Sequence, residues 1–204
     1  MNGLPEVVFG AEQIRRRVED VGAEIARAYA GREVCVVGLM KSCLVFMADL
    51  IRAVPGDLTC HMLRVQTFRD SETGSPRHDI VYYADIPYEG KDVLLLDDIL
   101  DTGITLDFIL EHVRARRPRS LRTCVLVDKP TDRKVGVKPD WALFTLEEPD
   151  QRFLVGYGLD WGEHHRGLPY IGAVPRPLDR AGTGAAAPGG PGAGQGAGPG
   201  GLGS

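Results

Sequence analysis

The sequence predicts an α/β fold in which a mostly parallel central sheet is flanked by helices. Apolar runs typical of strands alternate with stretches typical of helices, which is the order expected for a parallel sheet. Residues 93–96 (VLLL) are continuously apolar, as expected for a strand that is covered on both faces. The chain has 204 residues, a length that suits one domain with a sizeable core.

The individual elements follow from apolar spacing and from Gly and Pro stops. Apolar residues recur every three or four positions over 11–29, which indicates an amphipathic helix ending near Gly31. Further helices are expected over 44–54, before Pro55, and over 106–116. Strands are expected at 33–40, 58–65, 80–84, 92–96, 121–127, 141–146 and 153–156, with a polar segment at 69–79.

The end of the chain has a different composition from the rest. Residues 181–204 contain 11 glycines and almost no charge, so this stretch has little to bury in a core. We therefore expect a folded domain over residues 1–174 and a disordered Gly/Pro/Ala-rich tail over 175–204.

Composition disfavours several classes of protein. The net charge is −4, whereas a nucleic-acid-binding protein needs a basic face for the phosphate backbone. No run of about 18 apolar residues and no signal-peptide pattern occurs, which argues against a membrane partner. The four cysteines lack C-x-x-C spacing, so neither a disulfide framework nor a zinc site is expected. A cytoplasmic setting is the prediction.

Three carboxylates follow the apolar strand. Asp97, Asp98 and Asp101 precede the turn Thr102–Gly103–Ile104–Thr105, which leads into a predicted helix. Ligands of open α/β sheets bind at the carboxyl ends of strands, and helix N-termini attract anions. The pattern suits a ligand that carries phosphate, hydroxyls and a divalent cation. The alternative is an ordinary turn in which Asp101 or Thr102 only caps the helix.

Two other segments carry candidate binding groups. Lys41 and Ser42 follow the first predicted strand, where one cation and backbone donors can hold a diphosphate. Lys129 follows another strand, and Phe153 and Leu154 begin the last one. A flat heterocycle needs an aromatic face and a few polar groups at its edge. Taken alone, however, each is more simply explained as a surface lysine or a core side chain.

Two strings resemble a known family. Residues 97–105 resemble the phosphoribosyl-pyrophosphate (PRPP) signature of type I phosphoribosyltransferases, in which two acidic residues precede D-T/S-G-x-T. Residues 153–174 (FLVGYGLDWGEHHRGLPYIGAV) resemble the carboxyl-terminal segment of hypoxanthine(-guanine) phosphoribosyltransferases. The likeness spans about 7–174 and implies the type I phosphoribosyltransferase fold, with a small C-terminal hood and a mobile active-site loop.

The resemblance also implies an activity. It predicts a purine salvage enzyme that transfers the phosphoribosyl group of PRPP to N9 of hypoxanthine or guanine, with Mg²⁺. It implies a homo-oligomer, a dimer or tetramer, whose other partners are these small molecules. A PRPP-binding regulator of the same fold, with weak or no catalysis, is the alternative. A nucleoside-triphosphatase is disfavoured because G-x-x-x-x-G-K-[ST] does not occur.

Individual roles follow from the same resemblance. Asp101 would be the catalytic residue. Asp160, Asp97 and Asp98 would hold Mg²⁺, and Thr67 and Phe68 would belong to the lid loop. The purine would contact Lys129, Phe153 and Leu154. The PRPP-binding set would be Lys41, Ser42, Asp97, Asp98, Thr102, Gly103, Ile104, Thr105 and Arg166. Glu163, His164 and His165 are expected to be structural or surface groups.

Overall fold

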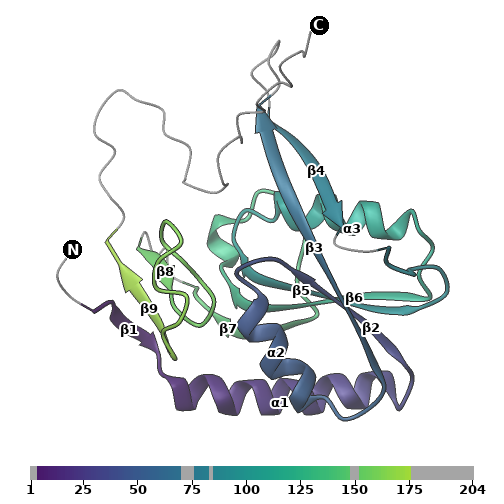
Figure 1. Ribbon diagram of the computed structural model, residues 1–204, viewed down its shortest axis with the longest axis horizontal. Helices are drawn as coiled ribbons and strands as arrows, with labels where there is room; N and C mark the ends of the chain where they lie inside the picture. The colour runs from purple at the N-terminus through teal and green to yellow at the C-terminus, as the bar shows by residue number, and fades with distance from the viewer. Residues whose placement is uncertain (1–3, 70–75, 83–84, 148–151, 176–204) are drawn as a thin grey trace, which may run out of the picture.

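The computed structural model describes residues 4–69, 76–82, 85–147 and 152–175. Its central sheet has the strand order β4-β3-β2-β5-β6-β7 (Figure 1). These strands are β2 (Val34–Leu39), β3 (Leu58–Arg69), β4 (Pro76–Tyr82), β5 (Asp92–Leu100), β6 (Ser120–Asp128) and β7 (Trp141–Thr145). All neighbours pair in parallel except β3 and β4. The predicted α/β fold with a mostly parallel sheet is confirmed.

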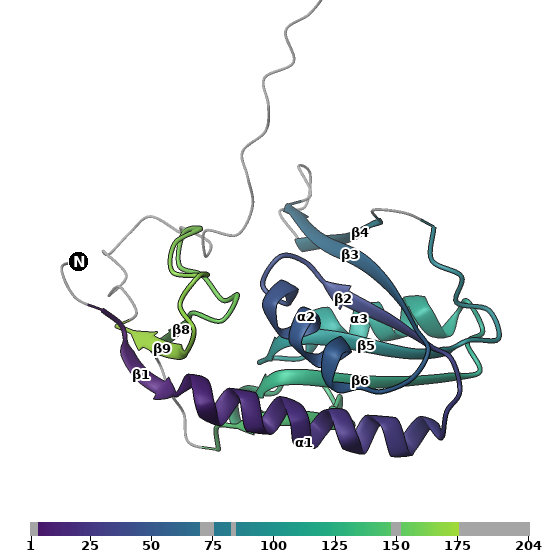
Figure 2. The ribbon, with the colours of Figure 1, turned by 60° about the horizontal axis from the view of Figure 1, so that its bottom comes forward.

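A second, antiparallel sheet forms the hood, with the order β1-β9-β8. It consists of β1 (Glu6–Phe9), β8 (Phe153–Val155) and β9 (Ile171–Val174). Figure 2 shows it beyond the carboxyl ends of the central strands. The hood is therefore not purely C-terminal, because β1 contributes one edge. β1 and β9 are not predicted from the sequence, because strands of four residues carry too little periodicity.

Three helices cover the central sheet. Side chains of α1 (Ala11–Tyr29) and α2 (Leu44–Ala53) share one core cluster with Leu94 and Leu96 of β5. Side chains of α3 (Ile104–Arg114) share the other cluster with Val93 and Leu95. Successive side chains of a strand point to opposite faces, so both faces of β5 are buried. This explains why its sequence is continuously apolar.

β3, expected over 58–65, continues to Arg69, where it pairs with β4. Two other strands also extend further than the sequence indicates. The expected strand 92–96 continues to Leu100, because Asp97, Ile99 and Leu100 still pair with β6. Part of the expected polar segment 69–79 is strand β4, which pairs with β3 from Pro76 onward. Hydrogen bonding to a neighbouring strand outweighs the local polarity in both cases.

Several sequence expectations fall partly or wholly outside the described residues. The backbones of Thr67 and Phe68 lie in β3, opposite His78 and Arg77 of β4. The side chains of these predicted lid residues lie outside the described residues, as do residues 70–75 between β3 and β4. The expected tail over 175–204 is also outside it, apart from residue 175.

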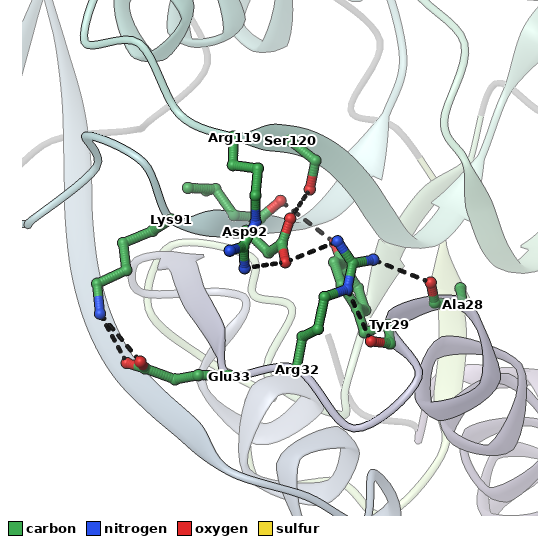
Figure 3. Close-up of polar contacts among 9 residues, drawn as sticks. Ala28, Tyr29, Arg32, Glu33, Lys91, Asp92, Arg119 and Ser120 are labelled. Carbon is green, nitrogen blue, oxygen red and sulfur yellow. Dashed lines mark hydrogen bonds and ion pairs between the residues drawn. The ribbon is translucent and has the colours of Figure 1, made fainter.

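A buried carboxylate holds together the amino edge of the central sheet (Figure 3). Asp92 at the start of β5 is 0% exposed and forms an ion pair of 3.0 Å with Arg32, which follows α1. It also accepts hydrogen bonds from Arg119 and from Ser120 Oγ, the latter at 2.5 Å. The hydrogen bond from Arg119 is the main reason that the pKa of Asp92 lies below its usual range.

The cysteines differ in exposure. All four are free thiols, of which Cys35, Cys43 and Cys124 are buried, whereas Cys60 on β3 is exposed. Partial burial nevertheless raises the pKa of the Cys60 thiol. Among the helices within the described ranges, none is both long enough and apolar enough to cross a membrane.

Candidate functional site

The acidic corner, which we define as Asp97, Asp98 and Asp101, lies at the carboxyl end of β5. Asp97 is 8% exposed, and its Oδ1 accepts a hydrogen bond of 2.9 Å from the backbone N–H of Asp98. Burial raises the pKa of Asp97 well above its usual range, and the neighbouring carboxylate of Asp98 raises it further. No basic side chain in the described residues forms an ion pair with Asp97 or Asp98. Their charge therefore calls for a cation or a hydroxyl donor from a ligand.

The turn after the acidic corner presents the start of α3. Gly103 is the N-cap at φ +82°, a conformation that disfavours other residues. A Cβ at this position would come within 2.9 Å of Arg133 Cδ and Val135 Cγ2. Ile104 and Thr105 in the first turn are exposed. Because the first backbone N–H groups of a helix have no partner within it, this turn can accept a phosphate.

Arg133 fixes this turn from the neighbouring loop and was not identified from the sequence. Its Nε donates to the carbonyl oxygen of Asp101 at 2.9 Å, and its Nη2 donates to that of Leu100 at 3.2 Å. It also pairs with the carboxylate of Asp128 at the end of β6. The backbone N–H of Lys134 donates to Thr102 O at 2.9 Å. A loop arginine has no periodicity or motif that would have revealed this role.

A second group of polar residues faces this edge from the loop after β2 and from the hood. Lys41 and Ser42 follow β2, and the peptide bond between Met40 and Lys41 is cis. Arg166 Nη1 donates to Ser42 Oγ at 3.2 Å and to Gly158 O at 2.8 Å. Any Cβ on Gly158 would collide with the carbonyl oxygen of Ser42. The two backbones are thus in direct contact, and Lys41, Ser42 and Arg166 are brought together as expected.

Asp160 and Glu163 add two carboxylates to this group. Asp160 Oδ1 lies 2.8 Å from Arg166 Nη2, and its Oδ2 accepts a hydrogen bond of 2.8 Å from the N–H of Glu163. Glu163 Oε1 lies 2.7 Å from Lys41 Nζ, and its Oε2 lies 3.2 Å from Arg166 Nη2. Glu163 was expected to be only a structural or surface residue. The signal for its position was the spacing D-x-x-E-x-x-R over 160–166.

The residues expected to hold a base lie in two places. Lys129 directly follows β6, with its Nζ 3.8 Å from Asp132 Oδ2 and its N–H donating to Leu100 O at 2.9 Å. It is therefore at the same sheet edge as the acidic corner. Phe153 is in the hood, where its ring packs edge-on against Trp161 with centroids 4.6 Å apart. Leu154 beside it is buried. Stacking of a purine on Phe153 stays a prediction.

The carboxylates suit Mg²⁺ only together with a ligand. In the described part of the chain, no three Asp, Glu, His or Cys side chains converge on one point. Asp97 and Asp98 belong to β5, whereas Asp160 belongs to the hood loop and contacts Arg166. Mg²⁺ usually takes one or two carboxylates and completes its shell with waters and substrate phosphates. These residues fit that mode of binding and not a cage made of protein alone.

A cavity of about 740 Å³ lies elsewhere, between α1, α2 and the loop 166–169. Its lining includes Ile14, Val18 and Val45, and of the polar site residues described above it includes only Arg166. It lacks the acidic corner and the start of α3. We therefore locate the functional site at the carboxyl edge of the sheet, where open α/β sheets bind ligands.

Comparison with known proteins identifies the family. Residues 10–161 match the model of the phosphoribosyl transferase domain. The chain is 37% identical over 171 residues to the hypoxanthine-guanine phosphoribosyltransferase of Bacillus subtilis, covering 84% of this chain and 93% of that protein. It is 43% identical over 167 residues to the enzyme of that name from Aquifex aeolicus, covering 81% and 92% of the two chains.

A solved structure agrees with these relatives. The hypoxanthine-guanine phosphoribosyltransferase of Bacillus anthracis superposes with a TM-score of 0.75 at 33% identity, covering 84% of this chain and 99% of that one. Together with the PRPP-type turn at the acidic corner, these matches establish the relationship. The chain belongs to the phosphoribosyltransferase family, within its hypoxanthine-guanine branch.

Proposed function

We propose that this protein transfers the 5-phosphoribosyl group of PRPP to N9 of hypoxanthine or guanine, releasing pyrophosphate and forming IMP or GMP. The observation that carries the proposal is the meeting of two oppositely charged groups at one sheet edge. The acidic corner lies at the end of β5 and leads into the start of α3, whereas Lys41 follows β2 and Arg166 belongs to the hood loop.

The 5′-phosphate and the diphosphate of PRPP would bind to different parts of this edge. The first turn of α3, with Thr102 and Thr105, binds the 5′-phosphate through backbone N–H and hydroxyl groups. Asp97 and Asp98 accept hydrogen bonds from the ribose hydroxyls. Lys41 and Arg166 bind the diphosphate, for which the forked donors of arginine are well suited. Asp97, Asp98 and Asp160 would hold Mg²⁺, which would neutralise the charge that develops on the leaving group.

The base is oriented by residues of β6 and the hood. Lys129 donates to the 6-oxo group, Phe153 stacks on the ring, and the backbone of Leu154 reads the adjacent ring nitrogen. N9 then forms a bond to C1′ of the ribose as the bond from C1′ to pyrophosphate breaks. Asp101 accepts the proton from N7. The chain thus acts mainly by positioning the two substrates and by stabilising charge in the transition state.

The direct test is product formation. The purified protein with PRPP, Mg²⁺ and hypoxanthine should produce IMP, and parallel reactions with guanine, xanthine and adenine establish which bases it accepts. PRPP binding without any nucleotide product from these four bases would instead support the regulatory alternative. Failure to bind PRPP in the presence of Mg²⁺ would refute both.

A further inference from the structure

We propose that Glu163 is an internal competitor of the diphosphate, which occupies Lys41 and Arg166 until pyrophosphate or PRPP displaces it. This inference rests on the proposed function, which assigns these two cations to the diphosphate. The argument starts from the way in which one carboxylate reaches both of them.

The two oxygens of Glu163 bridge the two cations. Oε1 lies 2.7 Å from Lys41 Nζ, and Oε2 lies 3.2 Å from Arg166 Nη2. Lys41 belongs to the loop after β2, whereas Glu163 and Arg166 belong to the hood loop. A diphosphate that binds the same donors likewise has one anionic oxygen for Lys41 and another for Arg166. Because these donors cannot serve two anions in the same positions, one anion must leave when the other binds.

The backbone of Glu163 is fixed, but its side chain is able to move away. Its N–H donates to Asp160 Oδ2 at 2.8 Å, and its φ is +69° in a tight turn. The side chain is 58% exposed, so it can rotate into water without opening the core. Exposed ion pairs such as these are weak, because water and salt screen them. The carboxylate is therefore held firmly enough to compete and loosely enough to be displaced.

The charge balance of this group points in the same direction. With Glu163 in place, Lys41 and Arg166 are balanced by Glu163 and Asp160. When the Glu163 carboxylate turns away, the group has an excess of positive charge, which attracts an incoming anion. Replacing Glu163 by a neutral residue should therefore tighten diphosphate binding.

The test measures pyrophosphate binding by titration calorimetry in buffer that contains Mg²⁺. For Glu163→Gln we expect affinity about three- to tenfold higher than for the unaltered protein, the range that two weak exposed ion pairs allow. Product inhibition by pyrophosphate should become stronger by a similar factor. The matched control is Glu111→Gln on α3, an exposed glutamate with the same change of charge, which should leave the affinity unchanged.

A double mutant tests whether the effect passes through Lys41. In a Lys41→Met background, Glu163→Gln should gain clearly less affinity than in the unaltered protein, because one of its two partners is already gone. Equal or weaker pyrophosphate binding by Glu163→Gln, alongside normal binding by the unaltered protein, would overturn the inference and leave the proposed function intact. If neither the unaltered protein nor any variant binds pyrophosphate in the presence of Mg²⁺, the proposed function itself fails.

Discussion

The two ends of β5 carry the same residue type in opposite surroundings. Asp92 at the amino end is completely buried, yet it has Arg32, Arg119 and Ser120 as partners, and its pKa is lowered. Asp97 at the carboxyl end is nearly as buried, but its neighbour is another carboxylate and its pKa is raised. The first arrangement favours the ionised form within the folded chain, whereas the second disfavours it. The comparison supports the proposal that one end serves folding and that the other serves a ligand.

The sharpest test of this division is Asp101→Asn in the acidic corner. We expect kcat for IMP formation to fall by about 10²-fold or more, because an amide cannot accept the N7 proton. The KM for PRPP should change much less, since the phosphate and diphosphate sites remain. Steady-state kinetics with hypoxanthine measure both. Equal losses in kcat and in PRPP affinity would argue against the assigned role.

Arg133→Lys tests whether the carboxyl end of β5 needs the hydrogen bonds that Arg133 donates to its backbone carbonyl groups. Lysine keeps the charge near Asp128 but cannot reproduce the fork that reaches the carbonyls of Leu100 and Asp101. We expect kcat/KM for PRPP to fall by about tenfold or more, in line with the sensitivity of catalysis to small misplacements. The melting temperature should change little. A large loss of stability with normal kcat/KM in the folded fraction would show that Arg133 is only structural.

Asp92→Asn and Asp97→Asn form a matched pair on one strand. Asp92→Asn should lower the free energy of unfolding by about 1–3 kcal/mol, because it removes the charge that its arginine partners contact. PRPP affinity should be preserved. Asp97→Asn should leave stability equal or slightly higher, because it removes an unfavourable buried charge, and it should weaken PRPP binding. Urea unfolding and PRPP titration distinguish the two, and similar effects from both variants would contradict the division.

The smallest expected effect is the pH dependence of stability in metal-free buffer. The folded pKa of Asp92 is lowered, so its contribution is present above the ordinary aspartate pKa of about 3.9 and is lost as the pH falls through the folded value. The folded pKa of Asp97 is raised. Between the ordinary aspartate pKa and this raised pKa, the folded chain therefore binds more protons than the unfolded chain. Its contribution therefore declines as the pH rises through that window.

The two variants separate these opposite trends. The stability difference between the unaltered protein and Asp92→Asn should shrink only at acidic pH. The stability of the unaltered protein, relative to that of Asp97→Asn, should instead decline as the pH rises above about 4. Unfolding curves collected from about pH 2 to about pH 8 measure both differences. Parallel curves for the unaltered protein and Asp97→Asn would contradict the raised pKa.

Long periodic segments and contiguous motifs can be predicted from the sequence. The helix over 11–29 has the predicted bounds, and the strand that carries the acidic corner was identified by its apolar run. The end of β5 was misjudged because Asp97 and Asp98 look like a turn, whereas pairing with β6 keeps them in the strand. The roles assigned to individual site residues remain predictions to be tested by the variants above.

Contacts between distant segments are harder to predict from the sequence. Arg133 reaches back 32 residues to the carbonyl of Asp101, and Glu163 reaches 122 residues to Lys41. No local pattern encodes such pairs, because they depend on how parallel strands and the hood bring separate loops to one edge. The same holds for Arg119, which precedes β6 and pairs with Asp92 of β5.

The placement of Cys60 gives the protein a practical handle. It is the single exposed thiol among the four cysteines, all of which the structure describes. A maleimide dye should therefore attach at one position, slowly at neutral pH because the thiolate is scarce there and faster in mildly alkaline buffer. Cys60 lies on β3, the strand that continues into the hairpin with Thr67 and Phe68. Fluorescence from this dye would report rearrangements of that hairpin during turnover without any engineered substitution.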